Sequence, residues 1–181
     1  MTHRTFGERT IVVAGILGAI VILLGATRLG FVAVPTPLGD ATIMHLPVII
    51  GGILEGPVVG VILGALFGIF SFLQVGSPIF KDPLVSILPR LFIGITAYLA
   101  YATFRRVSEY AALIVAAVVG TLTNTILVLG VAVLRGYLTS EAAVGYGIAA
   151  AVPEAILAVI VVVAVITAWK RIETGRGKSR V

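Results

Sequence analysis

The chain has 181 residues, of which 59% are hydrophobic and 12% charged, and its mean hydropathy is +1.16. A soluble domain of this size needs a more polar surface, so the composition excludes one and indicates an integral membrane protein. Cysteine is absent, which excludes disulfides and thiolate metal sites. The net charge of +5 does not indicate nucleic-acid binding, because most cations stand at the ends of apolar runs, where they orient a protein in a bilayer.

Six apolar segments predict six membrane helices, since a hydrocarbon core of about 30 Å needs about 20 helical residues. They are predicted at residues 9–27, 42–54, 57–73, 84–104, 110–134 and 148–169. A polar loop is expected at 135–147, and a basic tail that we expect to be disordered follows at 170–181. The sequence therefore predicts an all-α integral membrane protein, a six-transmembrane-helix bundle in a single domain, 1–181.

The first two segments each leave an alternative open. Two arginines precede the first, and small residues follow it, so it could be a signal peptide. The small pairs Ala14/Gly18 and Gly15/Ala19 favour a membrane helix with a packing face instead. The second segment is too short to cross without tilt, so it is either partly re-entrant or helped across by the residues before it.

The cations predict the orientation. Six crossings put both termini on one side of the membrane, together with nine of the Lys and Arg residues: Arg4, Arg9, Arg105, Arg106, Lys170, Arg171, Arg176, Lys178 and Arg180. The other side carries three, Arg28, Lys81 and Arg135. The positive-inside rule then places both termini in the cytoplasm of a multi-pass cell-membrane protein.

Glycine recurs every fourth residue through the third segment, at Gly56, Gly60, Gly64 and Gly68. This spacing stacks the glycines on one helix face. A face without side chains lets a neighbouring helix approach closely, as helices do in lipid. The third helix is therefore expected to pack through a glycine seam.

Two charged residues, Arg90 and Glu154, fall at similar depth inside predicted membrane helices. Charges there are costly and are candidates for function. In one interpretation the two pair with each other and lock their helices together. In the other, Arg90 binds a carboxylate or phosphate of a ligand, and Glu154 accepts from ligand hydroxyls or amides. Both interpretations can hold.

Further polar residues suggest a ligand cavity. Asn124 sits near mid-depth with Thr121 beside it, either bonding neighbouring helices or forming the floor of a cavity. Asp40, Thr42 and His45 stand at the outer lip, in a polar segment that we expect to close over a ligand. A lone histidine without cysteine is a poor argument for a metal site, so no metal is expected.

The sequence contains no complete catalytic motif of the kinds considered below. There is no His-Glu-x-x-His or Gly-x-Ser-x-Gly, and a lysine-serine pair near the C-terminus lacks the first glycine of a P-loop. The scattered acids and two histidines do not form a catalytic set. We therefore expect no enzyme activity, no ATP hydrolysis and no cofactor.

Three motifs together resemble the substrate-binding membrane subunit, or S component, of energy-coupling factor (ECF) vitamin transporters. They are GDATIMHLPVIIG at 39–51 followed by GPVVG at 56–60, LPRLFIG at 88–94, and GTLTNT at 120–125. The resemblance covers nearly the whole chain in order.

The resemblance implies a six-helix subunit that captures a vitamin from outside with high affinity. It implies association with an ECF transmembrane coupling subunit and two cytosolic ATPase subunits, which drive release inward. A small-xxx-small motif on the first helix contacts the membrane partner in this family. Ala14, Gly18, Gly15 and Ala19 match that motif without strict alanine spacing, which leaves the docking face open.

The motifs are most similar to the pantothenate group. Arg90 suits the carboxylate of pantothenate, and Asn124 and Glu154 suit its amide and hydroxyls. Few aromatics are candidates for the site (Phe72, Phe80, Tyr98 and Tyr146), which disfavours stacking on a large flat ring. The alternatives are another vitamin (folate, riboflavin, lipoate, a pyridoxine-type compound or cobalamin), a membrane-embedded lipid-modifying enzyme, or a scaffold subunit that transports nothing.

Overall fold

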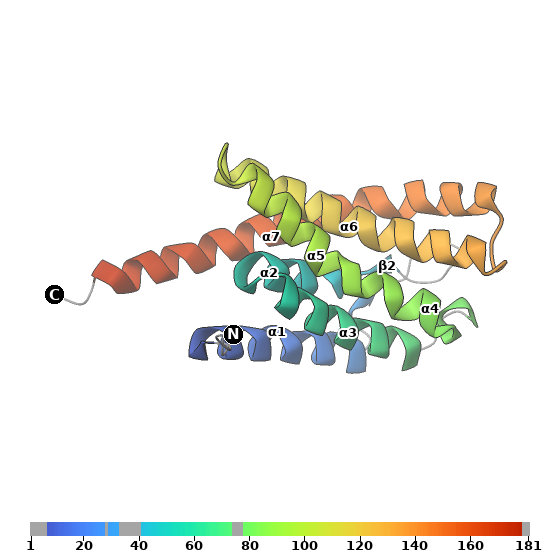
Figure 1. Cartoon of the computed structure of the whole chain (residues 1–181), viewed down its shortest axis with the longest axis horizontal. Coiled ribbons are helices and arrows are strands. Elements are labelled where there is room, and N and C mark those ends of the chain that lie inside the picture. The colour runs from blue at the N-terminus through green and yellow to red at the C-terminus, as the bar shows by residue number, and fades with distance from the viewer. Residues whose placement is uncertain (1–6, 28, 33–40, 74–77, 179–181) are drawn as a thin grey trace, which may run out of the picture.

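A computed structural model describes residues 7–27, 29–32, 41–73 and 78–178, and it shows a bundle of elongated helices (Figure 1). The elements in chain order are α1 (Glu8–Ala26), β1 (Phe31–Val32), β2 (Ala41–Thr42), α2 (His45–Glu55), α3 (Pro57–Leu73), the short 3-10 helix η1 (Pro78–Lys81), α4 (Pro83–Ser86), α5 (Leu88–Phe104), α6 (Glu109–Leu134) and α7 (Ser140–Lys178). The two strands form one small antiparallel hairpin, with Phe31 opposite Thr42.

Four helical stretches of the described chain are long and apolar enough to cross a membrane: 8–26, 83–104, 109–134 and 140–173. The two others, α2 and α3, are shorter apolar helices. At 1.5 Å per residue, the 11 residues of α2 extend only about 16 Å, so α2 cannot span a bilayer alone. The structure is thus a helical membrane bundle, while the crossing of α2 and α3 remains a prediction.

The last helix differs most from the expectation. The predicted loop at 135–147 is wrong in its second half, because α7 begins at Ser140. The predicted disorder of the tail is also wrong as far as Lys178, where α7 ends after 39 residues. Charged residues are compatible with a helix that leaves the membrane, and an ion pair of 3.0 Å between Arg9 and Glu173 ties this extension to the start of α1.

The predicted helix at 84–104 is interrupted near its start. Asp82 caps α4 by accepting a hydrogen bond of 2.9 Å from the backbone N–H of Leu84, and Pro83 occupies the first helical position. The chain then turns at Ile87 and resumes as α5. Pro89 explains the break, because proline has no N–H to donate to the carbonyl of Val85, four residues earlier.

The short helix α2 lies at the centre of the bundle and packs against α1, α3, α5, α6 and α7. Its residues from His45 to Ile53 are all buried. The main apolar core forms around it and includes Leu63 and Phe67 of α3 and Ile93 of α5. Because α2 touches five helices, polar side chains on it can meet partners from several of them.

The glycine seam of α3 is confirmed as a packing face. A side chain at Gly60 would meet the backbone of Gly94 at 2.8 Å, and one at Gly68 would meet Ile87 at 2.9 Å. A side chain at Gly64 would overlap the carbonyl of Arg90. The seam therefore sets the distance between α3 and the α4–α5 segment. Gly56 does not belong to it, since it has φ +94° and ends α2 with open space around it.

Candidate functional site

Arg90 is fixed in the first turn of α5 and is only 3% exposed. Its Nη1 donates to the carbonyl of Val85, the acceptor that Pro89 leaves without its helical partner. Its Nη2 donates to Ser71 Oγ of α3 at 3.2 Å. The guanidinium also lies over the rings of Phe67 and Phe80, at 5.2 and 5.3 Å from their centres.

One N–H donor of this guanidinium makes no hydrogen bond. Arg90 Nε is buried and has no hydrogen-bond partner. A buried N–H of a cation without an acceptor is costly, and the described residues supply no acceptor for this one. The anchoring of the two Nη atoms keeps the planar group in one orientation, which suits recognition of an anion.

Glu154 of α7 is 9% exposed, and its Oε1 accepts a hydrogen bond of 3.1 Å from the backbone N–H of Thr42 in β2. Arg90 and Glu154 do not form an ion pair, although each interacts electrostatically with the other. Direct pairing is therefore not what holds these two charges in the bundle. Each is held by its own partners, and the carboxylate fixes the end of the hairpin.

His45, at the start of α2, is 1% exposed, and its Nε2 lies 3.2 Å from Thr121 Oγ1 of α6. His45 also interacts electrostatically with Arg90. Its Nδ1 forms no hydrogen bond of good geometry, although the backbone of Thr42 is nearby. Because Nε2 can donate or accept, the ring can present either a donor or an acceptor at Nδ1.

Asn124 lies one turn beyond Thr121 on α6 and is 5% exposed. Its Oδ1 is buried without a partner. Thr42 is otherwise engaged, since its hydroxyl donates to the Gly30 carbonyl at 3.1 Å and accepts from Met44 N at 3.2 Å. Thr42 therefore has little hydrogen-bonding capacity left for a ligand. Asp40, also predicted at the lip, lies outside the described residues.

These contacts connect four helices in one region. His45 and Thr121 join α2 to α6, Thr42 and Glu154 join the hairpin to α7, and electrostatic interactions link Arg90 to both groups. The region contains a guanidinium, a carboxylate, an imidazole and an amide, three of which have an unpaired buried atom. This set suits a small polar ligand that carries an anion together with donors and acceptors.

Sequence reasoning missed Phe67 and Ser71 as partners of Arg90. A signal was present, because both lie three residues after a seam glycine (Gly64 and Gly68) and so share the face of α3 that meets α5. Tyr98 was a candidate for the site, but it lines a different pocket, with Glu55 and Arg105, near the start of α1. Within the described residues, no three His, Asp or Glu side chains come together as a metal site would require.

The four small residues of α1 divide between two faces. Gly18 is buried and faces Leu63 and Leu66 of α3, with 3.6 to 3.7 Å from its Cβ position to those side chains. Ala14 is half-buried against the same core. Gly15 and Ala19 are exposed, and nothing lies within 4 Å of the Cβ position of Gly15. The inward face is therefore occupied by the bundle itself.

Comparison with known proteins supplies the family. A sequence model of the family described as "ECF transporter, substrate-specific component" matches residues 9–166, which is most of the chain. A search of curated proteins found no match. The matched region extends from the start of α1 into the last third of α7 and includes every described residue of the site above. The chain belongs to the family of substrate-specific components of ECF transporters, which are membrane transport subunits rather than enzymes.

Proposed function

We propose that this protein captures a water-soluble vitamin, with pantothenate the best candidate, and delivers it inward as the S component of an ATP-driven ECF importer. The observation that carries the proposal is that three of the buried polar atoms without a hydrogen-bond partner belong to this region: Arg90 Nε, Asn124 Oδ1 and His45 Nδ1. Buried polar atoms in a folded protein normally have hydrogen-bond partners, so we expect a ligand to supply the partners that these atoms lack. The family supports transport of a small molecule.

The chemistry of the three atoms favours a small anion. Arg90 Nε donates, so it needs an acceptor such as a carboxylate oxygen. Asn124 Oδ1 accepts, so it needs an N–H or O–H. Pantothenate offers a carboxylate, an amide and two hydroxyls, which Arg90, Asn124 and Glu154 would bind respectively. His45 and Thr121 would hold the position of the amide side, and Asp40 and Thr42 would close the lip.

The rings around Arg90 also bear on the choice of vitamin. Phe67 and Phe80 already lie over the guanidinium, so their faces are engaged rather than offered to a flat ring. A riboflavin-like or folate-like ligand would need other aromatic faces to stack on. This arrangement favours a flexible, non-aromatic vitamin.

Delivery would follow from docking on an ECF transmembrane coupling subunit with two cytosolic ATPases. The exposed pair Gly15 and Ala19 is the face of α1 that we assign to the membrane partner, because Ala14 and Gly18 pack against the bundle. Small residues on an exposed face let a partner helix approach closely in lipid. Both termini would then lie in the cytoplasm beside the ATPases, as the distribution of cations predicts.

Isothermal titration of the purified protein against a panel of vitamins tests the substrate. We expect pantothenate to bind more tightly than folate, riboflavin, lipoate, pyridoxine and cobalamin. Its alcohol analogue, which lacks the carboxylate, should bind at least about tenfold more weakly, because a charge-assisted hydrogen bond is worth roughly 1.5–3 kcal/mol. Tighter binding of another vitamin, or equal binding of the alcohol, would contradict the assignment.

A further inference from the structure

The segment that precedes α5 encloses the guanidinium of Arg90. Val85 of α4 supplies the carbonyl that accepts from Arg90 Nη1, and the centre of the Phe80 ring in η1 lies 5.3 Å from Arg90 Cζ. Ser86 joins these two elements, because its hydroxyl donates to the carbonyl of Phe80. The positions of η1 and α4 therefore determine how the guanidinium is oriented.

Asp82 lies between η1 and α4 and hydrogen-bonds to both. Its side chain caps α4 through Leu84 N–H, and its carbonyl accepts from the N–H groups of Val85 and Ser86, each at 3.0 Å. Its own N–H donates to the carbonyl of Ile79 in η1 at 3.3 Å. Asp82 is only 8% exposed, so it has little freedom to move alone. A shift of Asp82 would therefore displace both elements that enclose the guanidinium.

Two residues that follow α6 hold the carboxylate of Asp82. Arg135 Nε donates to Asp82 Oδ2 at 2.7 Å, and the hydroxyl of Tyr137 donates to the same oxygen at 3.3 Å. A small apolar cluster packs the same segments together: Val85 of α4, Val128 and Ala132 of α6, and Ile79, Phe80 and Leu138 around them. The end of α6 thus fixes Asp82, and Asp82 fixes the elements around Arg90.

We propose that Asp82, held by Arg135, is a positioning residue that keeps the guanidinium of Arg90 in one orientation through η1 and α4. The inference rests on the proposed function, in which Arg90 Nε donates to the carboxylate of the ligand. Because the guanidinium is planar, a tilt turns its N–H groups away from that carboxylate. Loss of the bond between Asp82 and Arg135 should therefore weaken binding of an anionic ligand more than binding of its neutral alcohol analogue.

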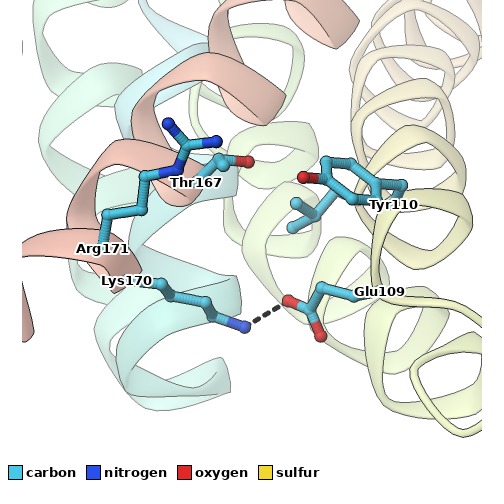
Figure 2. Close-up of a pocket in the computed structure, with 6 residues that line it drawn as sticks. Glu109, Tyr110, Thr167, Lys170 and Arg171 are labelled. Atoms are coloured by element: carbon cyan, nitrogen blue, oxygen red, sulfur yellow. Dashed lines mark hydrogen bonds and ion pairs between the residues drawn. The ribbon is translucent and has the colours of Figure 1, made fainter. Parts of the chain in front are cut away.

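A second carboxylate with similar partners provides a matched control. Glu109, at the start of α6, accepts from the hydroxyl of Tyr101 at 2.9 Å and from Lys170 of α7, and Figure 2 shows the pair with Lys170. The 26 residues of α6 extend about 39 Å, so Glu109 lies far from Arg135, which follows the other end of that helix. Glu109→Gln therefore alters a carboxylate bonded by a cation and a tyrosine without changing α4.

Nuclear magnetic resonance of the full-length protein in detergent, with isotope-labelled arginine and no ligand, tests how firmly Arg90 is held. Its Nε–H is buried, so this proton should exchange slowly with water, and Arg90→Lys identifies the signal. Asp82→Asn keeps a residue that caps helices and loses the charge that pairs with Arg135. Asp82→Asn and Arg135→Gln should each speed the exchange at least about fivefold. Glu109→Gln should leave it unchanged, and so should Lys81→Gln, which removes an exposed cation from η1.

Isothermal titration of the same variants with pantothenate and its alcohol analogue connects this orientation to recognition. Asp82→Asn and Arg135→Gln should each lower the preference for pantothenate about threefold to tenfold. The double variant should lower it no further, because both changes remove the same contact. The two control variants should keep the preference of the wild type.

Faster exchange and a reduced preference in both variants, with neither effect in the controls, supports the proposal. Unchanged exchange of the Arg90 Nε–H, additive effects in the double variant, or an equal effect of Glu109→Gln overturns it. An unchanged preference in the two variants, where the wild type prefers pantothenate, also overturns it. Faster exchange in both variants of a protein that shows no preference for pantothenate would support the positioning of Arg90 by Asp82 and contradict the proposed vitamin.

Discussion

Arg90 owes its position to the proline beside it. Pro89 leaves the carbonyl of Val85 without a helical donor, and the guanidinium of Arg90 supplies one. The sequence could predict that Arg90 lies within the bundle and is a candidate for function, because a charge within an apolar helix is costly. It did not show the contacts with Ser71 and Phe67 of α3, although the glycine spacing puts both on the face that meets α5, and Phe80 of η1 was only a candidate for the site.

A substitution of Asn124 tests what a single atom contributes to the candidate site. Replacing it with alanine removes the unpaired Oδ1, and we expect vitamin affinity to fall about tenfold to a hundredfold, as loss of one or two hydrogen bonds of roughly 1–3 kcal/mol predicts. Thr123→Ala is the control, since Thr123 bonds Thr96 at 2.9 Å instead. Titration calorimetry that finds the same affinity for both variants would show Asn124 to be structural.

A pH-dependent contact lies outside the membrane-spanning segments, where Arg135 Nε donates to Asp82 Oδ2 at 2.7 Å. The hydrogen bond from Arg135 lowers the pKa of Asp82 below its ordinary value of 3.8, and the same bond raises the pKa of Arg135. Because the folded-state pKa of Asp82 is depressed, this contact stabilises the fold above about pH 4 and is lost as pH falls through the lowered pKa.

Thermal unfolding across pH measures this contribution. Arg135→Gln should lower the melting temperature modestly at pH 7, because it removes the partner that holds the cap of α4. The gap between wild type and variant should close as Asp82 becomes protonated, below pH 4. A gap that stays constant down to pH 3 would mean that the loss comes from something other than the charge of Asp82.

At the scale of elements, the sequence patterns predicted how the helices pack better than they predicted where the helices begin and end. The four-residue glycine spacing indicated the seam of α3, and the structure places Gly60, Gly64 and Gly68 directly on the α4–α5 backbone. The extent of α7 was mispredicted, because hydropathy reports where a helix leaves the membrane and not where it ends. The break at Ile87 was also missed, although Pro89 was visible in the sequence.

The glycine seam of α3 packs against the backbone of Arg90, so a substitution in the seam should displace Arg90. Gly64→Ala would place a methyl group against the Arg90 carbonyl, and we expect it to cost about 1–3 kcal/mol of stability and to weaken vitamin binding. Gly130→Ala on α6 is the matched control, because nothing lies within 4 Å of that position and alanine favours helix. Thermal unfolding and titration should separate the two, and an unaffected Gly64 variant would show that the seam tolerates movement.

At the scale of the whole molecule, the candidate ligand site and the start of α1 are distinct regions. The hairpin, α2, the first turn of α5 and the polar residues of α6 and α7 form the candidate site. The ion pair of Arg9 with Glu173 instead joins the start of α1 to the C-terminal part of α7 (Figure 1). Composition predicted the membrane class, and the motifs predicted the family. The division of the small residues of α1 between two faces could not be predicted, because it depends on the position of α3.

This division predicts a variant that uncouples capture from transport. Gly15→Leu adds bulk to the exposed face of α1, so vitamin binding should be unchanged while co-purification with the ECF coupling module falls at least about tenfold. Gly145→Leu on α7 is the control, since that glycine is likewise exposed with open space around it. Loss of vitamin binding in the Gly15 variant, or equal effects of both, would remove this face as the docking surface.

The central claim is that a small anionic vitamin supplies the hydrogen-bond acceptor that the buried guanidinium of Arg90 lacks. Native mass spectrometry of the protein, incubated with an equimolar vitamin mixture that contains pantothenate, tests it most directly. The wild type and the exposed control Arg106→Ala should each retain one anionic vitamin, while Arg90→Ala, folded by its elution profile, retains none. Retention of the same vitamin by the Arg90 variant, or of no vitamin by the wild type, would contradict the account.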